Sequence, residues 1–300
     1  MFQFSVIIPI YNRQENLYLT LCALDKARVH YAAPLELIVM DDGSTDNPLE
    51  VMYEFQDRFA LQYRWQPHEG FGVTKARNRG CAIARGRNYL FVDSDILLTP
   101  ASLAHLRNIV NANPGVIVAG RYDWMKPMWI SAHDVYSNWH QIVAGTLITK
   151  PIYGEQVGIV GTDPRVVAQP ELFKPGSIQY KYASSLYSGV LLFPKDDFWA
   201  LGGYDENIKG HGGSDCEMGM RAQAARCPAI FTEFVHGYHV YHERDQAANQ
   251  ISRNRNIRYM ARKHDLDALG LYVWHVGEDY GILPKGQEPP EAVPEPSEET

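Results

Sequence analysis

The stretch Tyr89-Leu-Phe-Val-Asp-Ser-Asp95 joins a short apolar run directly to two acidic residues. The apolar part predicts a buried strand, which would end where the acidic residues begin. Apolar runs of the same kind lie upstream at 4–10 and 35–40, and another lies downstream at 116–119. Runs this short and this apolar are typical of strands that are buried on both faces of a sheet.

Amphipathic segments separate these predicted strands. Apolar residues recur at helical spacing in 15–27, and helices are also expected through 51–55, over 74–87 and over 100–111. Strands that alternate with helices form right-handed βαβ units. The first 120 residues therefore predict an α/β fold in which helices flank a mainly parallel central sheet, as in nucleotide-binding proteins.

The rest of the chain is less regular. Residues 121–187 are rich in Tyr, Trp, His, Pro and Gly and show only weak periodicity, so their structure is not predicted. Strand and helix patterns return between 188 and 264. From 284 to 300 the chain carries five prolines, five glutamates and one lysine, a composition that predicts a disordered acidic tail.

The composition excludes several classes of protein. The 300 residues include 28 Lys and Arg against 35 Asp and Glu, and a formal net charge of −7 argues against a nucleic-acid-binding protein, whose binding surface is basic. No apolar run approaches the roughly 20 residues of a transmembrane helix, and residues 1–9 lack the basic region and cleavage site of a signal peptide. Cys22, Cys81, Cys216 and Cys227 are widely spaced, which favours reduced thiols. We therefore expect a cytoplasmic protein, and peripheral contact with the inner face of a membrane stays open.

Polar residues follow three of the predicted strands. They are Tyr11-Asn-Arg13, Asp41-Asp-Gly-Ser44 and Asp93-Ser-Asp95. The carboxyl ends of parallel strands open onto one crevice, where α/β proteins bind their ligands. Paired carboxylates suit a hard divalent cation, although an isolated pair at a strand end is more often a turn. The three polar ends together favour a metal site for a diphosphate.

Basic residues open the helix that is predicted over 74–87. Lys75, Arg77 and Arg79 lie where the helix dipole would favour acids, so they suit contact with phosphate or with the acidic loops. A solvent-exposed basic helix end is the alternative interpretation.

Three histidines recur at every third position in Val235-His-Gly-Tyr-His-Val-Tyr-His242. This spacing suggests a metal site, but aromatic-rich loops also carry histidines that only form hydrogen bonds.

Large aromatic residues gather in the irregular segment, at Trp124, Trp129, Tyr136 and Trp139. Aromatic faces bind the apolar surfaces of sugar rings, so these residues could form an acceptor platform. They could equally fill the core of an inserted lobe.

Six segments resemble the successive motifs of family 2 glycosyltransferases with the GT-A fold. Four resemble donor-side motifs: Ser5-Val-Ile-Ile-Pro-Ile-Tyr-Asn12, Val39-Met-Asp-Asp-Gly-Ser-Thr-Asp46, Thr74-Lys-Ala-Arg-Asn-Arg-Gly80 and Phe91-Val-Asp-Ser-Asp95. Two resemble acceptor-side motifs: Gly202-Gly-Tyr-Asp-Glu206 and Gly212-Gly-Ser-Asp215. The resemblance runs from residue 4 to about 245 in the family's order. It implies a donor-binding half at 1–120 and an acceptor-binding half at 121–283 of one GT-A unit.

The resemblance assigns roles to residues that would bind the nucleotide. Pro9, Tyr11 and Asp42 correspond to positions that contact the base. Arg13 and Arg77 correspond to positions where basic side chains approach the nucleotide or its loops.

The resemblance also implies a metal site. Asp93 and Asp95 match the DxD motif, with Ser94 between them on the nucleotide side. The first aspartate would contact the ribose or a metal-bound water, and the second would bind Mn²⁺ or Mg²⁺. Some GT-A enzymes complete the metal shell with a histidine, and His242 matches that position best, with His239 as the second choice.

Asp215 matches the catalytic base of the family, which deprotonates the acceptor hydroxyl. Many relatives carry an acidic pair where this chain has Ser214-Asp215, and Glu217 would lie about 200° from Asp215 around a helix. Glu217 is therefore either an acceptor-binding residue or simply an acid in the first turn of a helix. The other acceptor-binding candidates are His211, Gly213 and Trp124.

The implied activity is the metal-dependent transfer of a hexose or N-acetylhexosamine from a nucleotide-diphospho sugar, preferably UDP-linked, to a hydroxyl of a carbohydrate or other acceptor. Such a reaction serves the biosynthesis of polysaccharides or glycoconjugates, and inversion is expected, although retention is not excluded. A nucleotidyltransferase that makes nucleotide sugars is an alternative, but residues 6–13 hold no glycine of a phosphate-binding loop. A non-catalytic module that binds sugar nucleotides is the other alternative.

Overall fold

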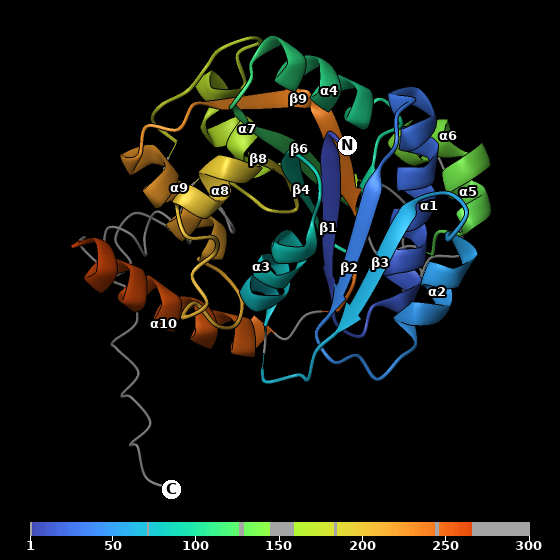
Figure 1. Cartoon of the computed structure of the whole chain (residues 1–300), viewed down its shortest axis with the longest axis horizontal. Coiled ribbons are helices and arrows are strands. Elements are labelled where there is room, and N and C mark those ends of the chain that lie inside the picture. The colour runs from blue at the N-terminus through green and yellow to red at the C-terminus, as the bar shows by residue number, and fades with distance from the viewer. Residues whose placement is uncertain are drawn as a thin grey trace, which may run out of the picture.

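A computed structural model describes residues 2–70, 72–125, 129–144, 159–182, 185–243 and 246–265. Its centre is one nine-stranded sheet with the order β3-β2-β1-β4-β8-β6-β9-β5, and β7 pairs with β6 beside this path (Figure 1). The strands are β1 Phe4–Ile10, β2 Glu36–Asp41, β3 Ala60–Trp65, β4 Asn88–Val92, β5 Ile96–Leu98, β6 Ile117–Met125, β7 Ile159–Gly161, β8 Val190–Pro194 and β9 Ala229–His239.

Helices cover both faces of this sheet. They are α1 Gln14–Tyr31, α2 Pro48–Glu54, α3 Val73–Ile83, α4 Ser102–Ala112, α5 Ala132–Ser137, α6 Trp139–Ala144, α7 Pro164–Ala168, α8 Lys195–Ala200, α9 Ser214–Ala224 and α10 Gln246–His264, with a short 3₁₀ helix at Pro170–Phe173. Figure 1 shows α1 and α2 on one side of β1–β3 and α3 on the other.

The strand β1 explains why this layering forms. Its seven residues are all buried, and alternate side chains point to opposite faces of the sheet. Val6 and Ile8 belong to the apolar core that includes residues of α1, whereas Ile7 belongs to the core that includes residues of α3 and α9. The continuous apolar pattern of this segment therefore reflects burial on both faces, as the sequence predicted.

The sheet is parallel in its first half and mixed as a whole. Strands β3, β2, β1 and β4 pair in parallel. Strand β8 then inserts antiparallel between β4 and β6, while β9 pairs parallel to β6 and antiparallel to β5. The expected mainly parallel arrangement therefore holds for β1 to β4, and the sheet is mixed from β5 onward.

The two predicted halves share this single sheet. Strand β5 comes from the first 120 residues, but its partner β9 comes from the second half. This pairing places Ile96 opposite His239, so that Asp95 lies beside Val240, whose N–H donates to the Asp95 carbonyl at 2.8 Å. The predicted acidic tail at 284–300 lies outside the described residues. Among the described helices, none is long and apolar enough to cross a membrane.

Candidate active site

The loops after β1 and β2 hold each other in place. The Asn12 side chain accepts a hydrogen bond from the Thr45 N–H at 2.7 Å, and the Asn12 N–H donates to Ser44 Oγ at 3.0 Å. Asn12 has a φ of 50°, a left-handed conformation that Asn tolerates better than most residues. The polar residues that follow the two strands therefore form one edge, as the sequence predicted.

Two of the predicted base-binding residues lie at this edge. Tyr11 is exposed and stacks on His68 with ring centroids 4.0 Å apart. Asp42 is buried and accepts hydrogen bonds from Gln66 Nε2 at 2.5 Å and from the Gly72 N–H at 3.0 Å, and His68 Nδ1 lies 3.1 Å from the same carboxylate. The third residue, Pro9, is buried within β1 opposite Met40. His68 links Tyr11 to Asp42, a connection that the sequence did not indicate.

Arg77 joins the DxD loop to the predicted base. Its Nη2 lies 2.7 Å from Asp93 Oδ1 and its Nη1 lies 3.5 Å from Asp215 Oδ1, while its guanidinium packs over the Tyr204 ring. Asp93 keeps partial access to water, but desolvation by the surrounding protein, with the like charges of Asp95 and Asp215, raises its pKa above the ordinary value despite the adjacent Arg77. Arg77 thus neutralises a group of acids that would otherwise repel one another.

Asp95, His239 and His242 form a cluster whose ligand atoms all lie within 4.8 Å of one another. Asp95 Oδ2 is 3.0 Å from His242 Nε2 and 3.6 Å from His239 Nε2. The Nδ1 atoms of His239 and His242 lie 2.9 Å and 3.0 Å from the backbone carbonyls of Val240 and Glu243. A proton on Nδ1 that donates to a carbonyl leaves Nε2 as the ligand atom, the usual state of metal-bound imidazole.

The donor set of this cluster fits the implied metal. One carboxylate oxygen and two imidazole nitrogens suit a first-row divalent cation such as Mn²⁺. Asp93, the other predicted ligand, pairs with Arg77 instead. His236 hydrogen-bonds Asp123 at 3.1 Å and does not belong to the cluster.

The other predicted donor-side residues lie around this cluster. Arg13 donates to the Glu243 carbonyl at 3.3 Å, the same carbonyl that lies 3.0 Å from His242 Nδ1, so it helps to fix the position of His242. Ser94 is buried, and its carbonyl accepts a hydrogen bond from Thr20 Oγ1 at 3.0 Å, which anchors the DxD loop on α1.

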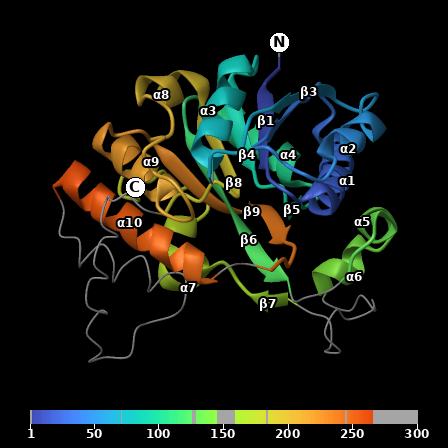
Figure 2. The ribbon, with the colours of Figure 1, turned by 90° about the horizontal axis from the view of Figure 1, so that it is seen from below.

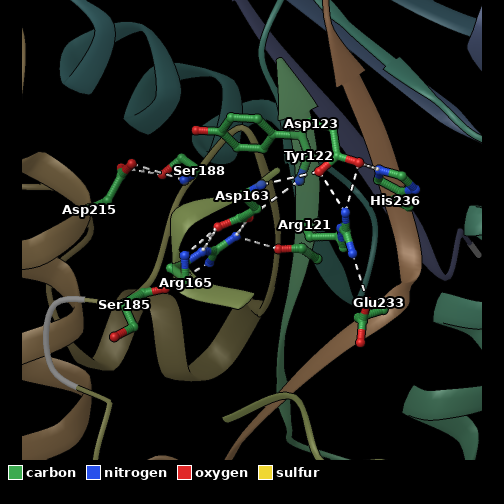
Figure 3. Close-up of polar contacts among 11 residues, drawn as sticks. Arg121, Tyr122, Asp123, Asp163, Arg165, Ser185, Ser188, Asp215, Glu233 and His236 are labelled. Atoms are coloured by element: carbon green, nitrogen blue, oxygen red, sulfur yellow. Dashed lines mark hydrogen bonds and ion pairs between the residues drawn. The ribbon is translucent and has the colours of Figure 1, made fainter. Parts of the chain in front are cut away.

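Asp215 lies in the first turn of α9, where the helix dipole favours a carboxylate. The Ser188 N–H donates to Asp215 Oδ2 at 2.9 Å, and the Ser188 hydroxyl hydrogen-bonds Oδ1 (Figure 3). The Ser188 hydroxyl also contacts the hydroxyl of buried Tyr204. Ser188 therefore fixes both oxygens of the predicted base, a role that sequence reasoning missed.

The predicted acceptor-side residues lie in different places: His211 and Gly213 precede α9, Trp124 lies beside the metal cluster, and Glu217 lies apart from both. Gly213, with a φ of 98°, is the N-cap of α9, and the backbone N–H of His211, in the same loop, donates to Ser252 Oγ of α10 at 3.0 Å. Trp124 lies against the metal cluster, with its ring centroid 4.3 Å from that of His239. Glu217 is fully buried, and its carboxylate lies against α10.

The contacts of Glu217 explain its position. It forms ion pairs with Arg221 at 2.6 Å, with Lys263 at 2.7 Å and with His264 at 3.1 Å. These contacts join α9 to α10, and the two helices lie side by side in both views (Figures 1 and 2). The hydrogen-bonding capacity of the carboxylate is thus used within the protein, and this favours the structural interpretation of Glu217.

The aromatic residues of the irregular segment do not form one platform. The Trp124 ring lies beside His239, whereas Trp129 is exposed. Tyr136 hydrogen-bonds Asp25 of α1 at 2.9 Å, and Trp139 packs edge-on against Tyr238. Only Trp124 of this group therefore lies beside the metal cluster.

A buried ion pair stabilises the part of β6 that borders the site, and sequence reasoning missed this pair as well. Asp163 and Arg165 have side chains that are 1% and 0% exposed, and they lie 2.6 Å apart. Arg165 also donates to the carbonyls of Ser185 at 2.8 Å and Gly120 at 2.7 Å (Figure 3). Asp163 is the N-cap of α7, so its position before Pro164 could have indicated a helix start but not this pair.

Comparison with protein families agrees with this geometry. Residues 5–162 match the model of glycosyl transferase family 2, and residues 174–243 match a model described as the N-terminal domain of galactosyltransferase. Among curated relatives, validoxylamine A glucosyltransferase of Streptomyces hygroscopicus subsp. limoneus is 30% identical over 275 residues, covering 87% of this chain and 56% of the relative. Chondroitin synthase of Pasteurella multocida strain Pm70 is 24% identical, covering 80% of this chain and 24% of the relative. The chain therefore spans about half the length of the glucosyltransferase and a quarter of the synthase.

Solved structures share the fold. S. aureus TarS 1-349 in complex with UDP-GlcNAc has a TM-score of 0.61 at 16% identity, covering 92% of this chain and 72% of that one. GalNAc-T7 with UDP, GalNAc and Mn²⁺ has a TM-score of 0.61 at 15% identity, covering 96% and 52%. These similarities confirm the GT-A fold. With more than half of its residues matched by the family model, the chain belongs to glycosyl transferase family 2.

Proposed function

We propose that the chain transfers a hexose or N-acetylhexosamine from a UDP-linked donor to a hydroxyl of a carbohydrate acceptor, with Mn²⁺ or Mg²⁺ and with inversion. The observation that carries this proposal is the position of Arg77, which contacts both Asp93 of the DxD loop and Asp215. Asp95, two residues from Asp93, contributes to the carboxylate–imidazole cluster. The contacts of one arginine with both carboxylates support a leaving-group site at the DxD loop and a base at Asp215.

Asp95, His239 and His242 would hold the metal, which when bound stabilises the negative charge of the departing diphosphate. Asp215 would accept the proton of the acceptor hydroxyl as its oxygen forms the new bond to the anomeric carbon. The bond from that carbon to the diphosphate oxygen breaks, and its electron pair leaves with UDP. Ser188 holds the Asp215 carboxylate in a single orientation during this transfer.

The donor side of the proposal rests on the exposed Tyr11–His68 stack and on buried Asp42 beside it. A flat aromatic surface with an adjacent carboxylate suits a nucleotide base, which stacks through its face and donates N–H groups at its edge. The fold relatives in complex with UDP-GlcNAc and with UDP support a uridine nucleotide. A relative named a glucosyltransferase supports a hexose.

Product analysis tests the proposal. Purified protein is incubated with UDP-glucose, UDP-galactose, UDP-GlcNAc or UDP-GalNAc and a panel of oligosaccharides, with Mn²⁺, with Mg²⁺ or with EDTA. We expect a glycosylated product and released UDP from one donor, only when a metal is present. Proton NMR of the new linkage should show the anomeric configuration opposite to that of the donor. Transfer in EDTA at an unchanged rate would contradict the metal role, and a retained configuration would contradict Asp215 as the base of a single displacement.

A further inference from the structure

Tyr122 of β6 lies between the metal cluster and the base. Its ring packs on the backbone at Gly189, where an added Cβ would lie 2.7 Å from Tyr122 Cε1. Gly189 follows Ser188, the residue that holds Asp215. On its other side, the Tyr122 ring centroid lies 6.0 Å from that of His239 and 5.4 Å from that of Trp124.

The hydroxyl of Tyr122 is directed into this region. Figure 3 shows the hydroxyl end of the ring on the side of Ser188 and Asp215. Within the described ranges the hydroxyl forms no hydrogen bond with the protein, and the residue is partly exposed. A phenol has an ordinary pKa of about 10, so at neutral pH Tyr122 is protonated and presents an O–H donor.

The backbone of Tyr122 is fixed by the Asp163–Arg165 pair. The Tyr122 N–H donates to Asp163 Oδ2 at 3.4 Å, and the Asp163 N–H donates to Asp123 Oδ1 at 3.1 Å. Arg165 binds the carbonyl of Gly120, next to an irregularity in the pairing of β6 with β9. A buried ion pair contributes little net stability compared with apolar packing, but it does specify a geometry. Here that geometry includes the part of β6 that carries Tyr122, which pairs with Gly237 of β9.

We propose that the Tyr122 hydroxyl hydrogen-bonds the sugar that is transferred, so that Tyr122 determines specificity for the hexose or N-acetylhexosamine part of the donor. This inference rests on the proposed function. In an in-line displacement the sugar ring lies between the leaving diphosphate at the metal and the acceptor hydroxyl at Asp215, and Tyr122 borders both places. An aromatic ring with a polar tip matches a sugar, which offers apolar C–H faces and hydroxyl acceptors.

Tyr122→Phe tests the inference because it removes one oxygen and keeps the ring. Calorimetric titrations in Mn²⁺ compare the affinities for UDP and for the donor among UDP-glucose, UDP-galactose, UDP-GlcNAc and UDP-GalNAc that binds the wild type best. We expect affinity for UDP within twofold of the wild type and affinity for the UDP-sugar lower by about tenfold, the loss of one hydrogen bond to a ligand. Tyr53→Phe, at an exposed position of α2, is the matched control and should change neither affinity.

Deoxy analogues of that donor identify the bonded atom. The penalty of Tyr122→Phe should disappear for the one analogue that lacks the hydroxyl bound by Tyr122, and it should persist for the other deoxy analogues. A penalty that persists for every analogue would overturn the contact with the transferred sugar.

The two proposals fail in different ways. If the wild type binds UDP in Mn²⁺ and Tyr122→Phe leaves the affinity for the UDP-sugar unchanged, the inference about Tyr122 is overturned while the proposed function stands. An equal loss for UDP and UDP-sugar would also overturn it, because Tyr122 would then act on the nucleotide site. If the wild type binds neither UDP nor any of the four donors, both proposals are overturned.

Discussion

Two arginines in this molecule pair with aspartates in opposite ways. Arg165 and Asp163 have side chains that are 0% and 1% exposed, so both partners are closed off from water. The side chain of Arg77 is 5% exposed, but its partners Asp93 and Asp215 are 37% and 27% exposed. An ion pair that water cannot reach can only maintain structure, whereas the exposed carboxylates beside Arg77 can contact a bound ligand. The difference separates the scaffold of the active site from its reactive surface.

The largest expected effect follows from the open side of this comparison. Asp215→Asn keeps the shape of the side chain but removes its ability to accept the proton of an acceptor hydroxyl. We expect the rate of sugar transfer to fall by about 100- to 10,000-fold, the usual contribution of a general base. Steady-state kinetics measures this loss, and calorimetry should show unchanged affinity for UDP. Asp196→Asn, on the exposed surface of α8, is the matched control.

Near-normal transfer by folded Asp215→Asn would contradict the assignment of the base. Loss of UDP binding in the same variant would indicate that Asp215 supports the donor site instead.

Removal of each arginine sharpens the contrast between the two pairs. Arg165→Met leaves the Asp163 carboxylate buried and unpaired, so the free energy of unfolding should fall by about 3–5 kcal/mol. Arg77→Met leaves carboxylates that water can reach, so its stability loss should be clearly smaller, while its affinity for UDP should fall. Urea denaturation gives the first quantity and calorimetry the second. Equal stability losses in the two variants would remove the distinction between scaffold and reactive surface.

Asp123, which accepts a hydrogen bond from the Asp163 N–H, should make the free energy of unfolding depend on pH in the acid range. Although burial alone would raise it, hydrogen bonds from His236 and Arg121 lower the pKa of Asp123 to about 2. A carboxyl group with a depressed folded-state pKa contributes stability above its unfolded pKa, and this stability is lost as the pH falls from about 4 towards 2. We expect Asp123 to contribute about 2 kcal/mol at neutral pH. Asp123→Asn should flatten the dependence of unfolding free energy on pH within that window, and an unchanged slope would reject the role of Asp123.

The smallest expected effect concerns the orientation of the base. Ser188→Ala removes the hydroxyl that contacts Asp215 Oδ1 but keeps the backbone hydrogen bond to Oδ2. We expect kcat to fall by about tenfold with an unchanged KM for the donor, because only alignment in the transition state is affected. Ser188→Thr keeps a hydroxyl and should recover part of the rate. An increase in the donor KM alone would place Ser188 in donor binding instead.

The sequence predicted those parts of the site that depend on local pattern. Asp93 and Asp95 follow a buried strand directly, and parallel pairing carries them to the same edge as Tyr11 and Asp42. The helical spacing of Glu217 and Asp215 likewise indicated that the two carboxylates could not easily serve one atom, although Glu217 stayed an acceptor-binding candidate, and Glu217 in fact pairs with Lys263 of α10. These predictions needed only strand ends and helical geometry.

Contacts between distant segments were not predictable in the same way. Ser188 lies 27 residues before Asp215, and Asp163 and Arg165 belong to a segment without clear periodicity. The histidine repeat shows why spacing alone misleads. His236 and His239 both lie in β9, where residues three apart point to opposite faces, so only His239 reaches the metal cluster. His242 joins it because the strand has ended.

The central claim is that Asp95, His239 and His242 hold a metal beside the nucleotide site. Titration of UDP into the protein with Mn²⁺ and with EDTA, for the wild type and for a His239→Ala/His242→Ala variant, tests it most directly. We predict that Mn²⁺ increases the affinity of the wild type for UDP by at least about tenfold, as expected for a cation that binds diphosphate oxygens. The same variant should bind UDP equally weakly under both conditions. Equal affinity of the wild type with Mn²⁺ and with EDTA, or an undiminished effect of Mn²⁺ on the variant, would contradict the account.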